Sequence, residues 1–93
     1  MKKSTNDNRI VSAQLRAARA LLRWSALDLA RASKVGVATI RRVEVLDGEL
    51  PVTVANEQAL RRALEGAGVE FIDGNGGGPG VRLRSLEERR KPP

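Results

Sequence analysis

The residues best suited to chemistry share one face of a predicted helix over residues 37–46. Val37, Ala38 and Arg41 fall on its outward side, together with Val45, when the other apolar residues are turned inward. An arginine guanidinium can donate two hydrogen bonds to the edge of a guanine, and small apolar groups can contact a thymine methyl. Such a face suits the floor of the DNA major groove.

Two short helices joined by a tight turn would position this face. The first is predicted to begin at Ser25, whose hydroxyl can cap the helix, with Asp28 completing a capping box. The pattern breaks at residues 33–36, and the small side chain of Ala30 would let the helices cross closely. The residues expected to fix this unit from the inside are Ala30, Val35, Ile40 and Val43.

Two further helices are expected on either side of this unit. Apolar residues at helical spacing predict a helix over residues 12–23 with Ser12 as its N-cap, and another that is capped by Thr53 and ends near residue 65. The second of these helices is expected to bury Val54, Leu60, Ala63 and Leu64.

Beyond these helices the period changes to that of strands. Residues 69–72 and 81–84 predict a β-hairpin with one apolar face, and we interpret the glycine-rich residues 73–80 as its flexible connection. A phosphate-binding loop would instead open a helix and carry a Gly-Lys-Ser/Thr sequence. Two strands alone are marginal in water, so the hairpin is expected to pack on the fourth helix or on the same hairpin of a second chain.

Charge is unevenly distributed along this 93-residue chain, which carries a net charge of +6. Residues 10–46 hold seven basic and two acidic side chains, whereas residues 47–70 hold two basic and five acidic ones. A basic surface favours a polyanionic partner. Arg16, Arg19 and Arg23 share one helix face, which is either a set of phosphate contacts or an ordinary solvated surface.

The chain resembles a known family over residues 12–66. The resemblance rests on the runs Gln14–Leu22, Trp24-Ser25, Leu29-Ala30-Arg31, Val35 and Ala38–Glu44, which are similar to the Cro/repressor-type helix-turn-helix regulators, also called the xenobiotic-response-element family. It implies a compact helical domain whose second motif helix enters the major groove, usually as a dimer on a palindromic operator. Carried over by position, the base-contacting residues are Val37, Ala38 and Arg41, and the phosphate-contacting ones are Ser25, Thr39 and Arg42, to which the basic helix face adds Arg19 and Arg23.

Three positions depart from the family pattern. Ala26 stands where glutamine is common, which removes one polar contact to DNA, and Gly36 replaces the usual serine or threonine cap. Lys34 occupies the turn position that usually holds glycine, and a left-handed lysine costs about 1 kcal/mol relative to glycine.

The predicted fold class is mainly α, a compact four-helix repressor-like domain followed by a C-terminal β-hairpin. We expect a disordered arm at residues 1–11, the helix-turn-helix domain at 12–68, the hairpin at 69–84 and a charged tail at 85–93. Trp24 is interpreted as a core residue, and Glu44 is expected to pair with a nearby arginine.

Composition argues against several other functions. The chain has no Cys or His, which excludes thiolate zinc sites and Ser-His or Cys-His nucleophiles, and no apolar run is long enough to cross a bilayer. We expect a cytoplasmic protein that is not an enzyme and uses no metal or cofactor. The sequence predicts a homodimeric, DNA-binding transcriptional regulator; the alternative is an antitoxin-like or anti-activator module that binds a protein partner, with DNA binding secondary.

Overall fold

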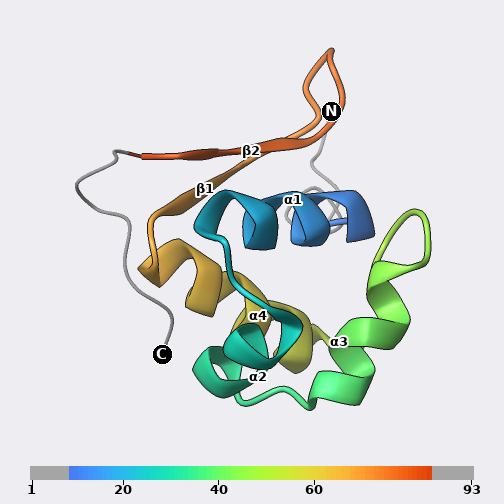
Figure 1. Cartoon of the computed structure of the whole chain (residues 1–93). Helices are drawn as coiled ribbons and strands as arrows, with labels where there is room; N and C mark the ends of the chain where they lie inside the picture. The colour runs from blue at the N-terminus through green and yellow to red at the C-terminus, as the bar shows by residue number, and fades with distance from the viewer. Residues whose placement is uncertain (1–8, 85–93) are drawn as a thin grey trace.

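The computed structural model describes residues 9–84, which form four helices followed by a two-stranded antiparallel hairpin (Figure 1). The predicted fold class and order of elements are thereby confirmed. The elements are α1 (Ser12–Leu22), α2 (Ala26–Ser33), α3 (Val37–Glu44), α4 (Val54–Gly66), β1 (Val69–Ile72) and β2 (Gly80–Leu83).

Aliphatic side chains from all four helices and from β1 make the core. Trp24 is the one aromatic residue of the described chain that is buried in this core, which confirms its interpretation as a core residue. Val54 was expected to be buried but is 55% exposed, because it is the first residue of α4 and points away from the core. The largest fully buried side chains are Ile10, Leu15, Leu29, Ile40, Leu60 and Leu64.

The N-terminal arm predicted over residues 1–11 extends too far into the chain. Ile10 is buried in the core, and its backbone N–H donates to the Glu57 carboxylate at 3.0 Å. The Arg9 guanidinium lies beside the same carboxylate, with 3.9 Å between Nε and Oε1. Residues 9–11 therefore belong to the folded domain, while residues 1–8 of the predicted arm and the predicted tail at 85–93 lie outside the described residues.

The predicted cap of the first helix is also wrong. Val11 is the N-cap of α1, and its N–H donates to Gln14 Oε1 at 2.9 Å. Ser12 is instead the first helical residue, and its buried hydroxyl donates to the carbonyl oxygen of Val43 at 2.8 Å. The hydroxyl thus joins two helices rather than capping one.

The hairpin packs on its own chain. Val69 pairs with Leu83 and Phe71 with Val81, and these four side chains lie against the core over α1 and α4. Figure 1 shows the hairpin along one side of α1, with α2 and α3 on the other side. The Gln14 amide donates to the carbonyls of both residues of the last strand pair, at 3.2 and 3.0 Å, which pins the hairpin to α1.

Lys34 has the left-handed backbone conformation expected for the turn position, with φ of 67°. A side chain in this region is strained by about 1 to 2 kcal/mol, and glycine relieves the strain at the cost of greater freedom in the unfolded chain. We predict that Lys34→Gly raises the free energy of unfolding by roughly 0.5 to 1 kcal/mol. Urea denaturation followed by the fluorescence of Trp24, the sole tryptophan, measures the change. Lys34→Ala removes the same charge but keeps the Cβ, so an equal gain for alanine would contradict the explanation.

Candidate DNA interface

The capping box predicted for α2 is present. Ser25 Oγ accepts from the Asp28 N–H at 3.0 Å, and the Asp28 carboxylate accepts from the Ser25 N–H at 2.9 Å. This reciprocal pair fixes the first turn of α2 at the domain surface. Leu29, fully buried, anchors the opposite side of the helix. Ser25, a predicted phosphate contact, is therefore exposed at a well-defined helix start.

The turn between α2 and α3 takes three residues. The Lys34 N–H donates to the carbonyl of Ala30 at 2.8 Å, which closes α2. The Ser33 hydroxyl accepts from the N–H of Val35 at 3.1 Å, and the Val35 side chain is buried as predicted. Gly36 is the N-cap of α3, and it has no side chain that could cap the helix.

Helix α3 has one buried and one exposed face. Ile40 and Val43 are buried, which confirms these two predicted anchors, and Glu44 is buried beside them. Ala38, Arg41 and Arg42 are exposed, whereas Val37 and Thr39 are half-buried. The structure thus places all the predicted base contacts, and the predicted phosphate contacts Thr39 and Arg42, on one short helix.

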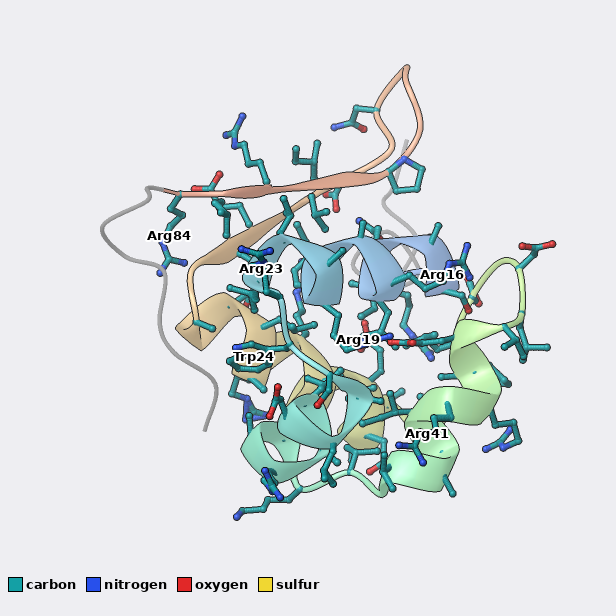
Figure 2. All side chains as sticks on the ribbon, in the orientation of Figure 1. Arg16, Arg19, Arg23, Trp24, Arg41 and Arg84 are labelled. Atoms are coloured by element: carbon teal, nitrogen blue, oxygen red, sulfur yellow. The ribbon has the colours of Figure 1, made fainter. Side chains whose placement is uncertain are left out.

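The two arginines of this face have their donors available. Within residues 9–84, no hydrogen bond or ion pair occupies the Arg41 or Arg42 side chain. Figure 2 shows Arg41 on α3, away from the hairpin and from the C-terminal end of α1. An exposed pair of guanidiniums beside small apolar groups can bind an anion and read a base edge at the same time.

Helix α1 holds the C-terminal end of α3. The Ser12 hydroxyl donates to the Val43 carbonyl, and Arg16 donates to the carbonyls of Glu44 and Leu46. These carbonyls lie in and just beyond the last turn of α3, where the helix leaves its acceptors unpaired. The side chains of α1 therefore satisfy the end of α3 that faces them.

Arg19 makes the strongest of these contacts. Its Nε and one terminal nitrogen bind both oxygens of the buried Glu44 carboxylate at 2.8 and 2.6 Å, and its other terminal nitrogen donates to the Trp24 carbonyl at 2.8 Å. The hydrogen bonds to Glu44 raise the pKa of the Arg19 guanidinium above its ordinary value, so it stays charged. Figure 2 shows Arg19 between α1 and α3. The expected pairing of Glu44 with a nearby arginine is confirmed.

The basic face of α1 is thus divided between different uses. Arg19 was predicted to contact phosphate, but all three of its donor nitrogens are engaged inside the domain. Arg23, the other α1 residue predicted to contact phosphate, is exposed at the C-terminal end of α1, and Figure 2 places it far from Arg41. The structure does not bring either residue onto the face that α3 presents. Ser12, Arg16 and Arg19 fall at helical spacing in the sequence, a signal that could have indicated their common task.

Comparison with known proteins adds no family. No protein-family model matches the chain, and no curated protein is similar to it.

None of the helices within residues 9–84 has the length and apolar character that crossing a membrane requires. The same part of the chain contains no cluster of acidic side chains that could hold a metal ion.

Removing the Arg19 side chain tests the α1–α3 connection. We predict that Arg19→Met lowers the free energy of unfolding by about 2 to 3 kcal/mol, because it leaves a buried carboxylate without its partner. Arg19→Met combined with Glu44→Leu should recover part of this loss, since no charge then stays buried. The matched control is Arg23→Met, which removes an exposed guanidinium and should change the free energy by less than about 0.5 kcal/mol. Equal losses for Arg19→Met and Arg23→Met in urea denaturation would refute the assignment.

Proposed function

We propose that this protein is a sequence-specific DNA-binding transcriptional regulator that inserts α3 into the major groove. One observation carries the proposal: α3 is fixed on one side by the core and by α1, while its other side presents Arg41 and Arg42 with no protein partner in the described chain. A short, rigidly held helix with an arginine-bearing outer face is the element that helix-turn-helix proteins place in the groove.

The proposed contacts divide into two kinds. Val37, Ala38 and Arg41 would meet base edges, with the guanidinium donating to a guanine and the small groups lying against thymine methyls. Thr39 and Arg42, together with Ser25 at the start of α2, would meet phosphates. This assignment leaves out Arg19 and Arg23 for the structural reasons given above.

The proposal includes membership of the Cro/repressor type of regulator and a homodimer on a two-fold operator. The support is the helix-turn-helix resemblance of the sequence together with a four-helix domain of the expected order. Two copies would place their α3 helices in successive major grooves, about 34 Å apart along the duplex.

The most direct experiment is selection of duplexes from a random pool, followed by titration of the enriched sequence at several salt concentrations. We predict enrichment of an inverted repeat, and an affinity that falls steeply with salt because phosphate contacts release counterions. The absence of any enriched sequence, with equally weak binding to all duplexes, would remove the basis for the proposal and favour a module that binds protein.

A prediction follows for Arg41. Arg41→Ala should weaken binding to the selected duplex by roughly 1 to 3 kcal/mol and relax the base preference at one position of each half-site, because the bidentate contact is lost. Fluorescence anisotropy with duplexes that carry all four bases at that position measures both effects. Arg23→Ala removes the same charge at the far end of α1 and should leave the base preference unchanged. An unaltered preference in Arg41→Ala would show that this residue does not read bases.

A different outcome is expected for Arg42, which we assign to phosphate. Arg42→Ala should weaken binding to the selected and to an unrelated duplex by similar factors. It should also reduce the slope of log K against log salt by about 0.9 per half-site. Titrations of both duplexes between low and moderate salt measure the slope. A loss confined to the selected duplex would instead place Arg42 on a base edge.

A further inference from the structure

We infer that the surface just beyond α3 is where a second copy of this chain docks. This surface, the post-α3 surface, consists of Val45, Leu46, Asp47 and Glu49, with Arg16 of α1 beside it. The inference rests on the proposed function only for the use of the dimer, since the docking itself requires no DNA.

The apolar side chains of the post-α3 surface are unusually exposed to solvent. Val45 is 79% exposed, the highest value among the large apolar side chains of the described chain, and the adjacent Leu46 is 39% exposed. The helix predicted over residues 37–46 ends at Glu44, and Val45 is its C-cap, with Leu46 following. Val45, which the sequence predicted on the outward face with Val37, Ala38 and Arg41, therefore lies at the C-terminal edge of that face. Exposed apolar side chains at the centre of a small patch are typical of a protein contact.

The charges around this apolar pair are of both signs. Asp47 and Glu49 are exposed, and neither carboxylate has an ion-pair partner in residues 9–84, although the whole chain carries a net charge of +6. Arg16 lies at the same place, because one of its nitrogens donates to the Leu46 carbonyl. In a two-fold contact each copy offers the same patch to the other. The arginine of one chain can then face the carboxylates of its partner, with the apolar pairs between them.

DNA does not fit this surface. Carboxylates repel phosphates, so Asp47 and Glu49 mark the end of the stretch over which the duplex can run. A second chain fits it, because the partner supplies both an apolar group and a basic one. If two copies meet beside the C-terminal ends of their α3 helices, both α3 helices lie on the same side of the dimer, where one duplex could reach both.

The hairpin is a poorer candidate for the same role. Its apolar face is already covered by α1 and α4 of its own chain. A two-fold pairing of β2 with β2 about Arg82 would set two arginines opposite each other, and a pairing of β1 with β1 about Glu70 would oppose two carboxylates. Like charges directly opposite each other destabilise paired strands.

The post-α3 surface is small, so its contact should be weak. Stable interfaces use roughly 20 to 30 residues on each side, far more than this patch offers. We therefore expect mainly monomer at low concentration and a dimer that forms at high concentration or on a two-fold duplex.

Cross-linking tests the inference cleanly because the chain has no native cysteine. The variants are Val45→Cys on the post-α3 surface, Ile72→Cys on the outer face of the hairpin and Leu27→Cys on α2, three exposed apolar positions. Each is treated with a short thiol-specific bifunctional reagent at high protein concentration, without DNA and with an inverted-repeat duplex. We expect Val45→Cys to give several-fold more covalent dimer than either control in both conditions.

Sedimentation of charge variants provides a second measurement. Asp47→Lys should weaken self-association by several-fold, whereas Asp73→Lys, the same charge change in the hairpin loop, should not. Cross-linking at Ile72 in preference to Val45 would overturn the inference in favour of the hairpin, and so would a chain that stays monomeric at high concentration and on the two-fold duplex. Cross-linking at Val45 without any duplex binding would support the inference and contradict the proposed function. Duplex binding without a cross-link at Val45 would support the proposed function and contradict the inference.

Discussion

The bidentate contact between Arg19 and Glu44 is the constraint on which the arrangement of α3 depends. One guanidinium holds the buried carboxylate at the end of α3 and the carbonyl of Trp24, one residue before the cap of α2. It therefore ties the end of one motif helix and the beginning of the other to α1. A planar fork of fixed donors can satisfy three acceptors from two directions, which the single ammonium of a lysine cannot do in the same geometry.

This constraint also separates structural from available charge. Arg19 is paired with the Glu44 carboxylate, so it contributes little free positive charge on the side of α1 that faces α3, whereas Arg16 donates only to neutral carbonyls and keeps its charge. On α3 itself, the guanidiniums of Arg41 and Arg42 have neither an ion pair nor a hydrogen bond within the described residues. Part of the positive charge of residues 10–46 is therefore used inside the domain, and the net charge of a segment overstates the basic surface it offers.

Local patterns in the sequence predicted the helices, the turn and the strands well, because the interactions that form these elements involve residues close together in the chain. The Ser25–Asp28 box, the left-handed Lys34 and the inward Ile40 depend on neighbours within a few residues. The errors at the start of the domain concern residues whose partners are distant in the chain. Ile10 looked like part of a polar arm because its partner Glu57 lies 47 residues away, and Ser12 looked like a cap because its acceptor lies 31 residues away. For the candidate site, the outward face of α3 was predictable from helical spacing, whereas the internal use of Arg19 was not.

The two ends of α3 are held in different ways, and this difference bears on how the helix could meet a duplex. At its C-terminal end Ser12, Arg16 and Arg19 engage its carbonyls and Glu44, so that end is fixed to α1. At its N-terminal end Gly36 provides no side-chain cap, and the first-turn N–H groups have no side-chain acceptor of their own. Unpaired N–H groups at a helix start favour an anion. Under the proposed function, the fixed end would therefore set the angle of α3 across the groove, and a phosphate at the other end would complete its hydrogen bonding only when DNA is bound.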